Sequence, residues 1–209
     1  MQFAKNLNWI IGLFFILAGL SAAHAADAGP DALVKSTADE VLAILKKDAD
    51  IKSGDQQKAI QLIDAKVLPH FDFAHMTQLA VGKNWARATP AQKQKLIGEF
   101  RQLLVRTYSS ALTEYRNQTI EYKPSNTAPG ATDATVKTLI NQGGGQPLEI
   151  DYSMHKVGGA WKVYDIVVDN VSLVTNYRNS FSTTVRQSGI DGLIKLLADR
   201  NQRELGNKG

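Results

Sequence analysis

The fold is decided by the stretch from Phe71 to Tyr115, whose sequence is FDFAHMTQLAVGKNWARATPAQKQKLIGEFRQLLVRTYSSALTEY. Thr89 has the side chain of a helix N-cap, Pro90 suits the first helical position, and Gln92 completes a capping box. These signals predict a long helix from Pro90 to about Arg116. Its apolar residues recur at spacings of three and four: Leu96, Phe100, Leu103, Leu104, Thr107, Tyr108, Ala111, Leu112 and Tyr115. One wide face of this helix must therefore be covered by other parts of the chain.

Further helices are predicted on both sides of the chain's central region. Apolar residues in helical register predict helices at residues 31–49, 55–68, 173–186 and 189–202. A short helix is predicted from Phe73 to Val81, because Gly82 follows it as a C-cap.

Between these helices the apolar period changes from 3.6 to 2, which indicates strands. Strands are predicted at residues 119–123, 135–141, 148–155 and 161–168, and Gly158-Gly159 suits a two-residue hairpin turn. Helices followed by strands and again by helices indicate the α+β class. We therefore expect a curved antiparallel sheet of about four strands wrapped by helices, of the nuclear-transport-factor-like kind.

The first 25 residues resemble an export signal. Lys5 provides a positive charge, residues 9–20 form an apolar run that is short for a bilayer span, and Ala23-His24-Ala25 resembles a cleavage site. We therefore expect a signal peptide at residues 1–25, a single domain at residues 26–209, and a periplasmic location. An uncleaved membrane anchor is the alternative. The chain has no cysteine, so disulfides and thiol chemistry are excluded.

The charge balance is mildly basic, with 24 lysines and arginines against 20 acids. The basic residues are scattered, and export argues against nucleic acid as a partner. A mild cluster near the C-terminus is interpreted either as a solvated face or as a weak attraction to anionic membranes: Lys195, Arg200, Arg203 and Lys208.

Few residues are arranged as catalytic sites require. His70, Asp72 and His75 lie close in sequence, but they lack the spacing of a catalytic zinc site, and Asp72 suits a helix cap. We therefore expect no metal. Asp165 and Asp169 sit where a general base is conceivable, which keeps open a small-molecule enzyme of the isomerase type.

Apolar side chains are more numerous than one helix face requires. Two interpretations stay open: a tightly packed core, or an apolar cavity between helix and sheet. Five tyrosines suit the mouth of a cavity, because each has an apolar body and a polar tip: Tyr108, Tyr115, Tyr152, Tyr164 and Tyr177.

The opening stretch also carries a family resemblance. The residues that carry it are Phe71-Asp72-Phe73, Met76, Leu79-Ala80-Val81-Gly82, Trp85, Thr89-Pro90, Gln92, Phe100, Leu103-Leu104, Thr107-Tyr108 and Tyr115. With the order of the predicted elements, they resemble the MlaC family, the periplasmic toluene-tolerance or ABC-transporter auxiliary family. Val81 departs mildly from the pattern, because leucine is expected there.

The resemblance implies a monomeric periplasmic phospholipid carrier that is not an enzyme and holds no cofactor, only phospholipid as cargo. Its implied partners are an inner-membrane MCE-domain ABC transporter complex and an outer-membrane lipoprotein–porin complex, between which it shuttles lipid to maintain outer-membrane asymmetry. An exported interaction protein with a solid core is a further alternative. We expect the acyl tails between the 90–116 helix, the inner sheet face and residues 171–181. The expected lining residues are Leu79, Trp85, Leu104, Tyr108, Leu112, Tyr115, Tyr152, Met154, Trp161, Val163, Val168 and Tyr177.

Overall fold

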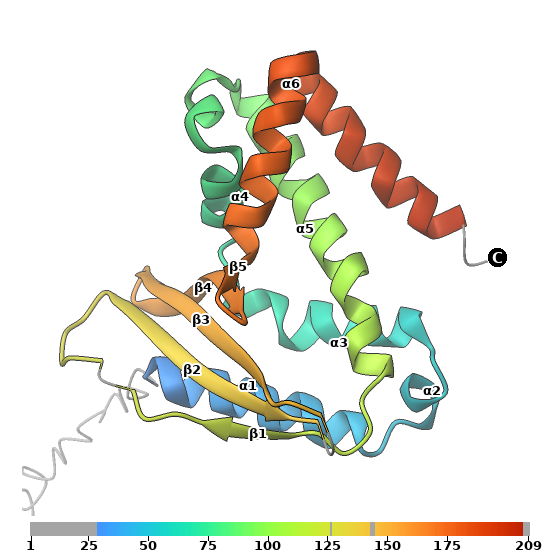
Figure 1. The fold of residues 1–209 in the computed structure, drawn as a ribbon, viewed down its shortest axis with the longest axis vertical. Coiled ribbons are helices and arrows are strands. Elements are labelled where there is room, and N and C mark those ends of the chain that lie inside the picture. Colours follow the sequence, from blue (N-terminus) through green and yellow to red (C-terminus); the bar gives the residue numbers. More distant parts are fainter. Residues whose placement is uncertain (1–28, 126, 143–144, 207–209) are drawn as a thin grey trace, which may run out of the picture.

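The computed structural model describes residues 29–125, 127–142 and 145–206. The predicted signal peptide lies outside these residues, so it stays a prediction. The predicted helices and strands occur in the expected order, but α2, η1, η2 and β5 are additional, and the helix predicted at residues 31–49 ends at Leu45 (Figure 1). The bounds are α1 Pro30–Leu45, α2 Ala49–Lys52, α3 Gln56–Lys66, η1 Leu68–His70, α4 Phe73–Val81, η2 Gly82–Arg87, α5 Pro90–Thr113, β1 Thr119–Tyr122, β2 Asp133–Asn141, β3 Leu148–Val157, β4 Ala160–Val168, β5 Val171–Ser172 and α6 Leu173–Gly206.

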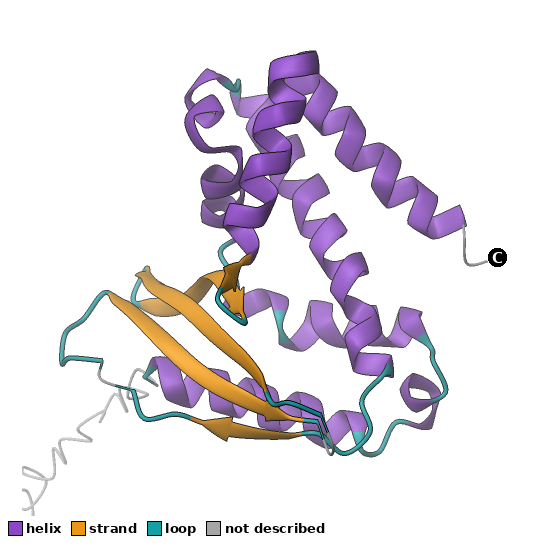
Figure 2. Ribbon diagram, in the orientation of Figure 1, coloured by secondary structure: helices purple, strands orange, loops and turns teal. Residues whose placement is uncertain are grey.

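The sheet is an antiparallel meander in the order β1-β2-β3-β4-β5. It lies at one end of the molecule, and the helices α4, α5 and α6 form the other end (Figure 2). The α+β class is confirmed, but the sheet has five strands rather than about four. The additional strand β5 has only two residues, which are too few to show a period of two in the sequence.

The start of the long helix α5 is fixed by the predicted capping box. The Thr89 hydroxyl accepts a hydrogen bond from the Gln92 backbone nitrogen at 3.2 Å, and the Gln92 side chain accepts one from the Thr89 backbone nitrogen at 3.0 Å. Gly82 ends α4 with a φ of 60°, a conformation that glycine adopts at little cost. Both signals were visible in the sequence because capping depends on neighbouring residues alone.

Helix α6 is two helical segments joined at Gly189. Its φ of 72° and ψ of −175° belong to a region that is open essentially to glycine. The chain reverses there, so that the second segment returns beside α5 (Figure 1). The sequence predicts this break between residues 186 and 189, and the structure confirms it.

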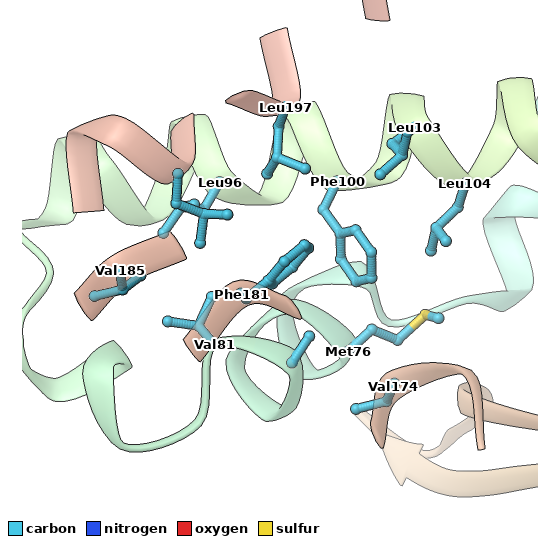
Figure 3. Packing of buried hydrophobic residues seen from close by; sticks show 12 residues of the cluster. Met76, Val81, Leu96, Phe100, Leu103, Leu104, Val174, Phe181, Val185 and Leu197 are labelled. Atoms are coloured by element: carbon cyan, nitrogen blue, oxygen red, sulfur yellow. The ribbon is translucent and has the colours of Figure 1, made fainter. Parts of the chain in front are cut away.

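The buried residues form three hydrophobic clusters. The helical cluster joins α4, α5 and both segments of α6 around Phe100 and Phe181, whose rings lie 5.1 Å apart (Figure 3). The lower helix cluster joins α1, α2 and α3 to Leu112 and Tyr115 at the end of α5. The sheet cluster packs Leu33 and Val34 of α1 against the sheet.

No helix in the described part of the chain combines the length and the apolar character needed to cross a membrane.

The conformation at Gly189 can be tested with alanine. Nothing lies within 4 Å of the space that a Cβ at this position would occupy, so Gly189→Ala adds only backbone strain. We expect a loss of about 1–3 kcal/mol in the free energy of unfolding, measured by urea denaturation. Gly98→Ala is the matched control, because Gly98 is helical and equally unobstructed. It should stabilise the protein by about 0.5–1 kcal/mol. Equal stability changes in the two variants would contradict the strain at Gly189.

Candidate functional site

The sheet has one apolar and one polar face, as its register shows. Residues paired across an antiparallel sheet point to the same side. The inner face carries, row by row, Ile120, Ile140 and Leu148; Tyr122, Thr138, Ile150 and Val168; Val136, Tyr152 and Ile166; and Ala134, Met154 and Val163. The outer face carries polar rows such as Thr135, Ser153 and Asp165. The inner face is therefore the surface suited to an apolar ligand.

Only part of this inner face is sealed by the rest of the protein. Helix α1 covers Val136, Met154 and Val163, which are buried in the sheet cluster. Ile150 and Val168 of the second row and all of the first row, which is Ile120, Ile140 and Leu148, are half-buried and lie outside the three clusters. In the second row, Tyr122 packs against the sheet cluster and Thr138 is buried. The apolar surface thus continues beyond the packed core.

Two tyrosines from the helical part occupy the edge of the helical cluster. The Tyr177 ring packs edge-on against Phe100 with centroids 5.0 Å apart, while its phenol group interacts with that of Tyr108. Burial raises the pKa of Tyr177 to about 12, and the neighbouring Tyr108 adds to this. Tyr108 is itself 48% exposed, although it belongs to the apolar stripe of α5. It is therefore an apolar group of the long helix that the fold leaves uncovered.

The twelve predicted lining residues are divided among the clusters and their edges. Leu79, Trp85, Leu104 and Tyr177 belong to or pack against the helical cluster, with Tyr108 at its edge. The sheet cluster or its edge contains Tyr152, Met154, Trp161 and Val163. Val168 lies on the inner face of the sheet, outside the three clusters. Leu112 and Tyr115 pack in the lower helix cluster, against α1, α2 and α3. The structure thus brings these residues together in groups, and their contact with a ligand stays a prediction.

A groove that the sequence did not predict lies between α3 and α5. It encloses about 870 Å³ and is lined by Gly54, Gln56, Gln57, Ile60, Asp64, Gly98, Arg101, Gln102, Val105 and Arg106. An ion pair of 2.9 Å joins Arg101 to Asp64 across the two helices. Polar and apolar groups line it in about equal measure, and none of the residues predicted for the cargo lies in it.

The acidic residues considered as a general base have structural partners. The Asp165 carboxylate accepts hydrogen bonds from the Ser172 hydroxyl and from the Val174 backbone nitrogen, at 2.5 and 3.1 Å. It therefore fastens β5 and the start of α6 to β4. Asp169 accepts a hydrogen bond from the backbone nitrogen of Glu149 at 3.2 Å.

A polar and aromatic cluster connects α4 to the outer face of the sheet. Asp72 caps α4 by accepting a hydrogen bond from the His75 backbone nitrogen at 2.9 Å, and its second oxygen lies 3.1 Å from Nε2 of His155. The His75 and His155 rings lie 4.8 Å apart, and both contact Tyr164. Among the described residues no group of histidines and carboxylates is arranged to hold a metal ion.

Comparison with known proteins assigns this chain to a family. The family model of the MlaC protein matches residues 35–199. The chain belongs to the MlaC family.

Relatives of known name agree with this membership in the MlaC family. The toluene tolerance protein ttg2D of Pseudomonas putida is 25% identical over 181 residues, which cover 86% of this chain and 84% of that protein. The intermembrane phospholipid transport system binding protein MlaC of Haemophilus influenzae is 23% identical over 199 residues, 93% of each chain.

A solved structure extends the comparison to three dimensions. The phospholipid-binding protein from Ralstonia solanacearum, determined in complex with a phospholipid, is 41% identical to this MlaC-family chain with a TM-score of 0.79. The match covers 86% of this chain and 99% of that one.

The histidine cluster predicts a pH dependence of stability. Burial lowers the pKa of His75, and the neighbouring His155 lowers it further, so the unfolded chain binds a proton at His75 at higher pH than the folded protein does. The free energy of unfolding should therefore fall as the pH drops below about 6.5.

Urea denaturation at several pH values between about 5 and 7.5 measures this effect. The stability of His75→Gln should fall less steeply over this range than that of the wild type, because the variant lacks the titrating group. An unchanged slope in His75→Gln would show that His75 does not contribute. Burial also lowers the pKa of His70, so His70→Gln measures how much of the pH dependence comes from this second histidine.

Proposed function

We propose that this protein is a periplasmic phospholipid carrier that holds its cargo against the inner face of the sheet. The observation that supports this most strongly is the solved relative of 41% identity, which was determined with a phospholipid bound and is matched over nearly its whole length. The names of the Haemophilus and Pseudomonas relatives point in the same direction. A signal peptide at residues 1–25, followed by one domain, is part of the proposal.

The sheet supports this role because its apolar rows extend past the part that α1 covers. Ile150 and Val168 are half-buried on these rows, and Tyr108 is an exposed aromatic group of α5. Acyl chains placed between the sheet, α5 and the start of α6 would bury these side chains. The tyrosines at this edge have polar tips that suit the boundary between tails and solvent.

The energetics of a lipid explain why a carrier is needed. Burial of acyl chain is worth about 0.8 kcal/mol per CH₂, so two tails of sixteen carbons represent roughly 20–25 kcal/mol in water. A free lipid therefore crosses an aqueous space very slowly. A protein that hides the tails removes this barrier, and the headgroup can remain in solvent.

We propose that the carrier works without catalysis and without a cofactor, with phospholipid as its cargo. Asp165 and Asp169 support this, because hydrogen bonds within the fold occupy their carboxylates. Release of the cargo requires a partner that favours an open state or that competes for the lipid. The proposed partners are an inner-membrane MCE-domain ABC transporter and an outer-membrane lipoprotein–porin complex, with the carrier acting as a monomer between them.

Solvent extraction of natively purified protein tests the cargo. Mass spectrometry of the extract should find phospholipid close to one molecule per protein, because detergent-free purification gives the tails no other apolar environment. Protein denatured in urea before purification and then refolded without lipid is the control for lipid that only adheres to the surface. Native protein with no more lipid than this control would contradict the proposal.

Two neighbouring valines of β4 test which face holds the tails. Val168 lies on the inner face and Val167 on the outer face, and both are half-buried. Val168→Asn places an unpaired amide beside the tails, which costs about 1–3 kcal/mol, or roughly fivefold or more in affinity. After incubation with excess acceptor vesicles, Val168→Asn should therefore retain several-fold less lipid than the wild type.

Val167→Asn is the matched control, because it makes the same change on the opposite face. It should retain lipid as the wild type does. Equal losses in the two variants would show that the effect comes from weakening of the strand, and equal retention would show that the tails lie elsewhere.

A further inference from the structure

The helical part of the molecule carries a group of basic side chains without neighbouring acids in sequence. Residues 73–98 contain four basic residues and no acid, and residues 173–190 contain two basic residues and no acid. We call these six residues the basic end: Lys83, Arg87, Lys93, Lys95, Arg178 and Arg186. They come from η2, the start of α5 and the first segment of α6, which lie in the upper half of Figure 1.

These three elements lie side by side, so the charges are gathered on one end. A Cβ on Gly82 of η2 would lie 3.7 Å from the Arg178 side chain of α6. Lys93 of α5 lies over the ring of Trp85 in η2 at 5.2 Å. Five of the six basic side chains are exposed, and Lys93 is half-buried.

Within the described residues, no carboxylate forms an ion pair with the basic end. Arg178 donates to the backbone oxygen of Leu79 at 2.8 Å, and Arg186 donates to the Thr183 hydroxyl at 3.1 Å. Asp191 is the next acidic residue along α6, and its carboxylate accepts a hydrogen bond from the Gln92 side-chain amide at 2.9 Å. In the described ranges, the ion pairs of lysine and arginine lie elsewhere: Lys35–Asp39, Lys58–Asp48, Lys58–Asp50, Lys66–Glu40, Arg101–Asp64, Lys123–Glu121, Lys137–Asp151 and Lys195–Asp199.

We propose that the basic end is the surface by which this protein docks onto bilayers that contain anionic phospholipid. The inference rests on the proposed function only in that a lipid carrier has reason to visit a lipid surface. Exposed lysines and arginines are attracted to anionic headgroups, and each contributes about fivefold in affinity near the surface.

The distribution of the charges favours a bilayer over an acidic protein. The six cations are spread over three elements, whereas a protein partner presents carboxylates at fixed positions. Lipid headgroups diffuse laterally and gather beneath cations in any arrangement. Trp85 is half-buried among these cations, and tryptophan suits the boundary between headgroups and water.

The basic end also adjoins residues that we expect to contact the cargo. Tyr177 precedes Arg178 on α6, and Trp85 lies between Lys83 and Arg87 in η2. Docking through this end would therefore bring the elements predicted to hold the tails close to the lipid surface.

Vesicle co-sedimentation tests the docking surface. The probes are vesicles of phosphatidylcholine alone and vesicles with about 30% phosphatidylglycerol, at about 0.02 M and about 0.5 M salt. The wild type should bind the anionic vesicles at low salt, lose most of this binding at high salt, and bind the neutral vesicles about tenfold or more weakly.

Charge reversal at two separate sites distinguishes binding through a defined surface from binding driven by net charge alone. Lys83→Glu with Arg87→Glu should weaken binding to anionic vesicles by about tenfold or more. Lys46→Glu with Lys47→Glu is the matched control, because these exposed residues follow α1 and the change in net charge is identical. The control should change binding by less than about twofold, and thermal melting should show that both variants fold.

Two outcomes overturn the docking proposal. Equal weakening in both variants would show that net charge alone drives binding. Wild-type protein that does not prefer anionic vesicles would leave an acidic protein as the partner of this end. The amount of phospholipid extracted from each variant tests the proposed carrier function independently of vesicle binding. A wild type that binds anionic vesicles but contains no lipid would support the docking surface and contradict the proposed carrier function.

Discussion

The arrangement of this molecule depends on how the apolar face of α5 is covered. Its first half packs against α4 and α6 around Phe100, and its end packs against α1, α2 and α3 through Leu112 and Tyr115. Helices therefore cover both ends of the stripe. The sheet receives its cover from the start of α1 instead, which leaves Ile150 and Val168 only half-buried. An apolar surface outside the core follows from this division of contacts.

The elements could be predicted from the sequence wherever neighbouring residues determine them. The capping box at Thr89 and Gln92, the stop at Gly82 and the Gly158-Gly159 turn are of this kind, and each has the expected conformation. Strand β5 could not be predicted, because its two residues pair with Val167 and Val168 only after the chain turns at Asp169 and Asn170. Both turn residues have positive φ, which Asp and Asn adopt more readily than most side chains, but the two residues that follow are too few to identify a strand.

The candidate site was less accessible to prediction than the fold. Periodicity shows that Leu104, Tyr108 and Tyr115 share a stripe, but not what packs against each one. The structure buries Leu104 and Tyr115 in different clusters and leaves Tyr108 48% exposed. The groove between α3 and α5 was missed for a related reason. Its Arg101 and Gln102 occupy the polar face of α5, which resembles a solvated helix surface until α3 is placed against it.

The charge asymmetry follows from the way in which the helices are capped. Asp48, Asp55 and Asp72 cap α2, α3 and α4, where a carboxylate is favoured by the helix dipole. Helix α5 begins instead with the neutral Thr89 and Gln92, so its start adds no acid to an end that already carries Lys83 and Arg87. The cap of the long helix therefore adds no charge of its own to this end, where Gln92 donates a hydrogen bond to the Asp191 carboxylate. Since α5 also provides Tyr108 to the apolar edge, one helix links the proposed cargo surface to the proposed docking surface.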